Sequence, residues 1–536
     1  MSIKLFKQLF SLIFAISLSL NYSAHEQVFH RGNGEEVETL DPAKVTGLPA
    51  VNVIMDLYEG LMSTDQTGKL IPGQAQSYSI SKDLKTYTFK LKDNLRWSNG
   101  DKLTADDFVV GMQRAVDPIV GSVYADFLKP IKNAEKIISG KLKVDTLGVS
   151  ALDDKTVVIT LEKPTLYILQ ILTNPTTYPI HQPSLKKYGD DFTKPGNLVS
   201  NGPFKLAQWV VNSHLTVAKN FYYIDSNKVK LDKVIFYPII EQSVELNRYR
   251  SGELDYTNII PDVQFDWIKK NLAKELYISP QLGNYYYGFN LRKEPFKDNK
   301  NLRKALSLAI DRKIIAEKIL RSGQIATDYL VPDQIDNYSP INQRNINIDK
   351  TVNVDSVKRI NLAKEYYKLS GYSTENPAKV KITYNTQESH KNVAIAVAAM
   401  FKKVLGVNTE LVNQEWKVFL RTREMGEETQ LFRDGWIGDY NDPATFLDLY
   451  TSTNPQNYSG FRNQEYDNLM QQASLEIDLT KRAQILAKAE ELLLNEAVMI
   501  PLYTYVSRHL VKPRIGGFAT NILDRTLDKY IYIKDV

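Results

Sequence analysis

Residues Leu95–Phe108 read LRWSNGDKLTADDF, and this stretch decides the fold. Asn99 and Gly100 in its middle favour a tight turn, because both residue types tolerate the positive φ angles that such turns need. Thr104 and Asp107 have the spacing of a capping box, in which each side chain accepts a hydrogen bond from the other residue's backbone N–H. The stretch therefore predicts a tight turn followed directly by a capped helix.

Strand and helix patterns follow one another along the rest of the chain. Alternating apolar residues predict strands at 86–91, 157–161 and 214–218. A helical apolar period predicts helices at 301–320, 357–369, 391–405 and 479–494. We therefore expect an α/β fold. The 536 residues exceed the roughly 300 at which a single core stops growing, so several closely docked domains are expected.

The N-terminal residues have the pattern of a secretory signal peptide. Lys4 and Lys7 precede the apolar run Leu9–Leu20, and small or polar residues follow up to Ala24. Cleavage is expected after Ala24, with cleavage after Ser19 as the alternative. The sequence has no cysteine, so it can carry neither a disulfide nor a lipid anchor on a thiol. We expect a periplasmic protein.

Charge and motif content argue against several function classes. Removing Lys4 and Lys7 lowers the formal net charge from +5 to +3, and there are no basic runs, which argues against binding to nucleic acid or a membrane surface. The chain has no phosphate loop, Gly-x-Ser-x-Gly elbow or His-Glu-x-x-His motif, and its six histidines are scattered. We expect no enzyme activity, cofactor or metal. The 31 tyrosines suit a ligand cleft, but codon bias explains them equally well.

The stretch Leu95–Phe108 resembles the signature of family 5 extracellular solute-binding proteins, which bind peptides, dipeptides or nickel for ABC importers. Further stretches that resemble the family are Leu40–Pro42, Asn247–Asp255, Arg303–Leu306, Ala309–Arg312 and Leu510–Pro513. Two more stretches, Asn413–Lys417 and Gly435–Pro443, are similar to its oligopeptide-binding branch in particular. The resemblance runs in order over nearly the whole mature chain.

The resemblance implies a two-lobed periplasmic-binding-protein fold that closes around its ligand, with an additional α/β domain on the first lobe. The layout that it implies is a signal peptide at 1–24, a first lobe at 25–59, 182–283 and 505–536, the additional domain at 60–181, and a second lobe at 284–504. It also implies a monomer that binds short peptides and delivers them to the permease subunits of an ABC importer in the inner membrane.

Charged and main-chain groups of the ligand site are implied by the same resemblance. Asp439 is expected to pair with the amine of the peptide. Because an extended peptide advances about 3.3 Å per residue, ligands of different length need cationic partners at different distances from Asp439. The residues at these positions are Arg433, Arg423 and His390. The main chain of Thr46 and Leu48 is expected to pair with the peptide backbone.

Four aromatic residues are expected to wall the cleft: Trp416, Trp436, Tyr124 and Tyr286. Structural roles stay open for the whole set. Asp439 also suits a turn cap, the arginines suit ion pairs, the aromatic rings suit core packing, and the segment around Thr46 suits a surface turn. His390 suits a helix start.

The chain departs from the oligopeptide-binding branch at three places. Thr46 stands where the relatives have an acidic residue, and Leu320 stands where they have a lysine. Their cysteine pair falls on Gly283 and Ile437. Preferences for ligand charge and length are therefore left open.

Capture of short oligopeptides through amine, backbone and carboxylate is the leading hypothesis, with murein peptides as the alternative ligand class. A nickel or haem chelate has no need of Asp439. A periplasmic hydrolase needs a nucleophile or an acid–base pair that the sequence does not reveal. A folding helper would bind long unfolded segments instead of enclosing short ones.

Overall fold

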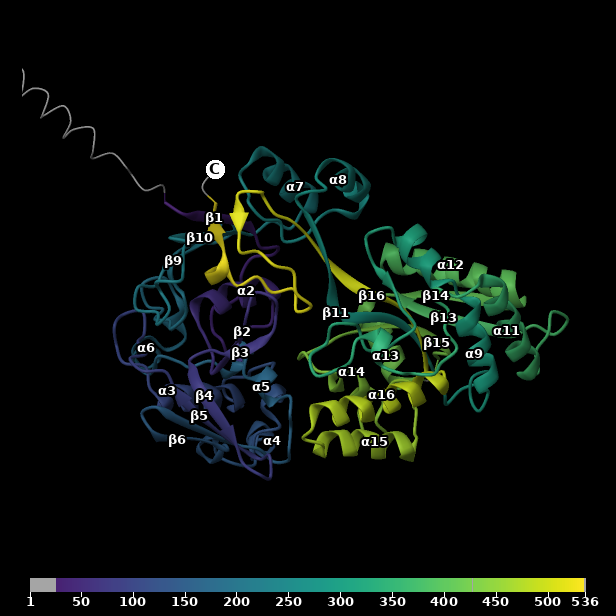
Figure 1. Cartoon of the computed structure of the whole chain (residues 1–536), viewed down its shortest axis with the longest axis horizontal. Coiled ribbons are helices and arrows are strands. Elements are labelled where there is room, and N and C mark those ends of the chain that lie inside the picture. The colour runs from purple at the N-terminus through teal and green to yellow at the C-terminus, as the bar shows by residue number, and fades with distance from the viewer. Residues whose placement is uncertain (1–25, 427, 535–536) are drawn as a thin grey trace, which may run out of the picture.

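The structure, a computed structural model, describes residues 26–426 and 428–534. Figure 1 shows two bodies joined by the long strands β11 (Leu276–Phe289) and β16 (Met499–Leu510). We call the body that contains β1 the first lobe and the other the second lobe. The expected two-lobed α/β fold is confirmed. The predicted signal peptide lies outside the described residues.

One sheet of the first lobe joins segments that are far apart in the sequence. Its order is β1–β10–β9–β8, with β1 parallel to β10 and the other pairs antiparallel. The strands are β1 (Val28–Gly32), β8 (Phe204–Val210), β9 (His214–Lys219) and β10 (Lys233–Tyr237). The helices of this part are α2 (Leu48–Leu57), α6 (Gln182–Tyr188), α7 (Gln242–Ser251) and α8 (Phe265–Asn271). The C-terminal segment adds the pair β17 (Ile515–Gly516) and β18 (Tyr532–Ile533).

A second sheet, of order β4–β5–β7–β6, is antiparallel throughout. Its strands are β4 (Ala75–Ile80), β5 (Thr86–Leu91), β6 (Val149–Asp153) and β7 (Thr156–Thr160), and β2 (Met62–Thr64) pairs separately with β3 (Leu70–Pro72). Its helices are α3 (Ala105–Val116), α4 (Ala134–Ile138) and α5 (Ile168–Ile171). Gly100 has a φ of +95° in the turn, and the Asp107 carboxylate accepts a hydrogen bond from the Thr104 N–H at 2.9 Å. The predicted turn and capped helix are confirmed.

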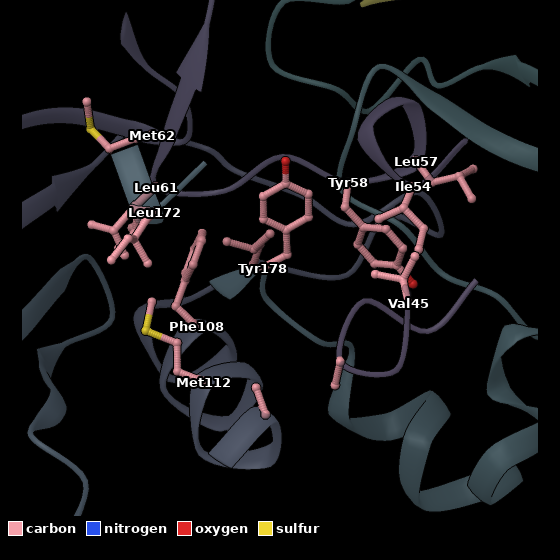
Figure 2. Packing of buried hydrophobic residues seen from close by; sticks show 14 of the residues in the cluster. Val45, Ile54, Leu57, Tyr58, Leu61, Met62, Phe108, Met112, Leu172 and Tyr178 are labelled. Carbon is pink, nitrogen blue, oxygen red and sulfur yellow. The ribbon is translucent and has the colours of Figure 1, made fainter. Parts of the chain in front are cut away.

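A single hydrophobic core runs through both of these sheets. Phe29 of β1 and Phe89 of β5 are fully buried in the same cluster. Figure 2 shows Phe108 and Met112 of α3 on one side of Tyr178 and Ile54 of α2 on the other. The second sheet is therefore packed firmly on the first lobe. The domain boundaries given above remain a prediction.

The second lobe is built on a six-stranded sheet of order β12–β16–β11–β15–β13–β14. Its other strands are β12 (Ile325–Ala326), β13 (Lys379–Asn385), β14 (Asn408–Gln414) and β15 (Leu431–Ile437). The helices of the cluster around Tyr285 and Tyr287 are α9 (Lys300–Ala309), α11 (Ser356–Leu369) and α12 (Glu388–Leu405). The helices of the cluster around Tyr286 are α14 (Ala444–Leu447), α15 (Gln464–Leu475) and α16 (Leu479–Asn495). Because successive strand residues face opposite sides, the two clusters lie on opposite faces of the sheet.

The prediction of one helix over 301–320 is wrong. Helix α9 ends at Ala309, and Ile310 is extended. Asp311 then caps a new helix, α10 (Arg312–Ile314), by accepting a hydrogen bond from the Ile314 N–H, and the chain continues as a π-helix. The break places the Arg312 guanidinium in the interior, where its Nε donates to a backbone carbonyl at 2.6 Å. The apolar period continues across this break, which is why it predicted one helix.

Strands β11 and β16 pass from one lobe to the other as an antiparallel pair. Leu276 lies opposite Leu510 in the first lobe, and Gly288 lies opposite Met499 in the second. The register shifts just after Pro280, and such irregularities bend strands. Two bent strands between lobes suit a hinge. Among the helices in the described part of the chain, none combines the length and apolarity that crossing a bilayer requires.

Candidate functional site

A cavity of about 390 Å³ lies between the two lobes. Thr46, Leu48 and Tyr124 line it from the first lobe, and Asp439 lines it from the second. The C-terminal residues 522–525 contribute to the same wall. The structure thus brings four of the ten predicted site residues together in one cavity.

Asp439 follows β15 and projects a carboxylate that has no hydrogen-bond or ion-pair partner among the described residues. Its backbone N–H donates to the Thr445 hydroxyl at 3.1 Å. Asp439 is exposed at the cavity wall, and partial loss of water there raises the pKa of its carboxylate to about 6. The turn is capped by another residue, because the Ala444 N–H donates to Asp442 at 3.0 Å. Asp439 therefore does not act as the turn cap.

Trp436 supports the position of Asp439. Its indole Nε1 donates to the Thr445 hydroxyl at 3.1 Å, which is the same oxygen that accepts from the Asp439 N–H. The ring is half-buried against the second-lobe core. One hydroxyl therefore ties the end of β15 to the segment that carries Asp439.

Thr46 and Leu48 lie at the N-terminal end of helix α2. Leu48 begins α2 and is 77% exposed. The Glu38 carboxylate accepts hydrogen bonds from the N–H groups of Thr46 and Gly47 at 2.9 and 2.6 Å. Glu38 thus places a carboxylate beside Thr46. Glu38 lies eight residues earlier in the chain, so no local pattern pointed to it.

Arg433 and His390 lie in the cluster on the Tyr285 face of the sheet. The Arg433 guanidinium lies 5.0 Å from the centre of the Tyr285 ring and donates to the Tyr505 hydroxyl at 3.2 Å. His390 is buried, and burial together with the Arg433 charge lowers its pKa to about 3. His390 is therefore neutral at physiological pH and can offer a carboxylate a hydrogen bond but no charge.

Arg423, Tyr286 and Trp416 lie outside the cavity lining. Arg423 forms an ion pair with Asp434 at 2.5 Å. Tyr286 is a core residue of the second lobe, 4% exposed. Trp416, at the start of α13 (Trp416–Met425), is 46% exposed. Arg423 and Arg433 thus have protein partners, whereas the Asp439 carboxylate has none among the described residues.

The arrangement suits binding. A ligand-sized cavity between two hinged lobes can hold and enclose a small molecule. Within residues 26–426 and 428–534, no cluster of three or more His, Cys, Asp or Glu side chains could hold a metal ion. Fold and cavity together define the class of binding proteins that close two lobes around a solute.

The chain belongs to family 5 of the bacterial extracellular solute-binding proteins, whose model matches residues 69–458. It is 38% identical over 514 residues to the periplasmic oligopeptide-binding protein OppA of Salmonella typhimurium, covering 95% of this chain and 93% of the relative. It is 38% identical over 523 residues to the periplasmic murein peptide-binding protein MppA of Escherichia coli, covering 94% of each. These relatives agree with the expected periplasmic location.

Solved structures distinguish the open from the ligand-bound arrangement. The unliganded open form of the murein tripeptide-binding protein MppA has a TM-score of 0.88 at 38% identity, covering 95% of this chain and 98% of that chain. Haemophilus influenzae OppA in complex with RPPGFSPFR has a TM-score of 0.73 at 37% identity, covering 95% and 99%. Since the identities are nearly equal, the difference reflects the lobe arrangement, and the lobes of this protein stand open.

Proposed function

We propose that this protein captures short oligopeptides in the cavity between its lobes and delivers them to the permease of an ABC importer. The observation that carries this proposal is the Asp439 carboxylate, which lines the cavity and has no ion-pair partner among the described residues. Closure of the lobes would remove water from this carboxylate, and an enclosed carboxylate is costly unless a cation pairs with it. Every ordinary peptide has an ammonium group. Among the relatives, OppA is named for oligopeptides and MppA for murein peptides.

The other groups of the site serve the parts that all peptides share. Tyr124 and the start of α2 face Asp439 across the cavity and are available to the peptide backbone and side chains. Arg433 and Arg423 are the proposed carboxylate partners of longer peptides, with His390 as a neutral donor. Trp436 positions Asp439, and the exposed Trp416 joins the site once the lobes close, while Tyr286 supports the site from the core of the second lobe. Closure excludes water and strengthens each of these polar contacts.

The protein acts as a monomeric receptor and not as an enzyme. Calorimetry with tri- to pentapeptides is expected to show binding, and mass spectrometry after prolonged incubation is expected to return the peptides uncut. An absence of heat with every peptide contradicts the proposal, and cleaved peptides contradict the receptor role.

Murein peptides are the second candidate ligand class. The observation that favours them is the 38% identity to the murein peptide-binding protein MppA, which equals the identity to OppA. Competition between a murein tripeptide and tri-alanine for the same site separates the two classes. Stronger binding of the murein tripeptide by more than tenfold identifies the specialised receptor.

A further inference from the structure

Five acidic or basic side chains line the cavity, and three of them are neutralised by partners within the protein. Arg31 donates to both carboxylate oxygens of Asp528 at 2.9 Å. His509 pairs with Asp524 at 2.7 Å. The two remaining lining residues are Asp439 and Arg525. Among the described residues, no carboxylate lies within ion-pair distance of Arg525, and its side chain makes no hydrogen bond.

The position of Arg525 is fixed by its own segment. Its backbone N–H donates to the Asn521 side chain at 3.2 Å, and its carbonyl accepts from the Asn521 amide at 2.7 Å. Asn521 is 7% exposed. Gln281 donates to Asp524 at 3.0 Å and holds the neighbouring residue as well. The main chain on either side of the guanidinium is therefore held in place before any ligand arrives.

An unpaired arginine in such a place is unusual for this protein. Buried arginines elsewhere have hydrogen-bond partners: Arg344 pairs with Glu490 at 3.3 Å, Arg482 pairs with Asp442 at 2.8 Å, and Arg303 donates to three backbone carbonyls. Arg525 is partly buried, and burial lowers its pKa, with only the nearby Tyr178 acting in the opposite direction. A guanidinium that loses water without gaining a partner destabilises the unliganded protein. An anionic group of the ligand would supply the missing partner.

We propose that Arg525 is a specificity-determining residue that binds a carboxylate of the same ligand whose amine Asp439 holds. The inference rests on the proposed function and deepens it. The two charges, neither of which has an ion-pair partner among the described residues, have opposite sign and line one cavity of about 390 Å³. A ligand that fills this cavity can therefore contact both, and a planar guanidinium fork matches a carboxylate in two-point geometry. The preferred ligand carries an acidic side chain.

The test compares acidic peptides with their uncharged isosteres by calorimetry. Wild type is expected to bind Ala-Glu-Ala-Ala or Glu-Ala-Ala-Ala at least about tenfold more tightly than the matching glutamine peptide. Arg525→Gln is expected to abolish this preference and to melt at the same temperature as unliganded wild type or slightly higher, because the variant removes a guanidinium without an ion-pair partner. Arg525→Lys should restore part of the preference. Arg462→Gln, an exposed arginine outside the cavity lining, is the matched control.

A second set of titrations distinguishes a side-chain carboxylate of the ligand from its C-terminal carboxylate. Alanyl-alanine and its C-terminal amide report on the terminal carboxylate of a dipeptide, whereas the tetrapeptides report on a side chain. A preference confined to the dipeptide pair overturns the side-chain assignment. If wild type binds tetra-alanine but does not favour the acidic peptides, or if Arg525→Gln keeps the preference, the inference fails while the proposed function stands. If no peptide binds at all, both fail.

Discussion

Tyr440 stacks flat on Tyr167, with ring centroids 4.2 Å apart and an angle of 6° between the planes. Tyr440 directly follows Asp439 in the second lobe, whereas Tyr167 belongs to the body of the first. Gln170 of α5 also donates to Asp336 of the second lobe at 3.0 Å. The open form is therefore braced by side-chain contacts across the cleft, next to the proposed amine partner.

Removing this stack should favour closure. Tyr167→Leu is expected to raise peptide affinity about 2- to 10-fold, because an aromatic pair contributes roughly 0.5–1.5 kcal/mol to the open form and less energy is then needed to leave it. Calorimetry measures the affinity, and small-angle scattering checks that wild type becomes more compact with peptide. Tyr222→Leu, at a residue 51% exposed, is the control. Weaker binding by the Tyr167 variant would show that the stack persists in the closed form.

Asp439→Asn should remove most of the affinity for peptides with a free amine. The expected loss is about 2–5 kcal/mol, because the ammonium group loses its charged partner inside a closed cleft. N-acetylated peptides should lose little further affinity. Asp126→Asn, which breaks a surface pair with Lys129 at 3.0 Å, controls for the loss of a carboxylate elsewhere. Equal losses for free and acetylated peptides contradict the assignment.

Peptide affinity should fall as the pH falls through about 6. The pKa of Asp439 is about 6 in the open protein, so the carboxylate is charged above this pH and increasingly protonated below it. At pH 5 about one molecule in ten retains the charge, and the affinity should be about tenfold lower than at pH 7.5. Titrations at several pH values measure this directly.

The Asp439→Asn variant provides the control for the pH effect, because its affinity should be flat over the same range. His509 also lies at the cavity. A pH effect that remains in Asp439→Asn would therefore come from His509 and not from Asp439. The raised pKa of Asp439 also makes the free energy of unfolding depend on pH. The folded protein binds the Asp439 proton more tightly than the unfolded chain, so this group destabilises the fold fully above about pH 6. The effect fades as the pH falls below about 6 and is lost only below the ordinary aspartate pKa of about 4. The variant should therefore melt higher than wild type at pH 8, by a smaller margin at pH 5, and equally below about pH 4.

Thr445→Val should weaken binding through a residue that touches no ligand. The valine removes the hydroxyl that accepts from Trp436 and from the Asp439 N–H, at a cost of about 1 kcal/mol for each hydrogen bond. Free-amine peptides should bind several-fold more weakly, and acetylated peptides should be unaffected. Thr445→Ser keeps the hydroxyl and should rescue both affinity and melting temperature. A loss of melting temperature alone indicates a purely structural role.

Local signals predicted local structure well. Strand β5 spans Thr86–Leu91 as expected, and α3 begins at the predicted cap. The break at Asp311 shows where such signals conflict, since an apolar period continues across a residue that also caps a new helix. A capping signal inside a periodic run was available in the sequence and outweighs the period here.

Only part of the candidate site could be predicted from the sequence. The resemblance led to Asp439, which indeed lines the cavity. Arg525 could not be found in this way, because its significance lies in the lack of a partner, and that depends on how Arg31 and His509 use the nearby carboxylates. Local sequence patterns do not predict which residues pair when they lie hundreds of positions apart in the chain.

The ion pair between Arg31 and Asp528 joins groups separated by 497 positions. Ribosomes add about 5–20 residues per second, so roughly half a minute or more passes between the appearance of the two partners. During that time Arg31 lacks its hydrogen-bonded partner, and the first lobe cannot complete its packing. The last step in folding of this half of the molecule therefore follows synthesis of the C-terminal segment.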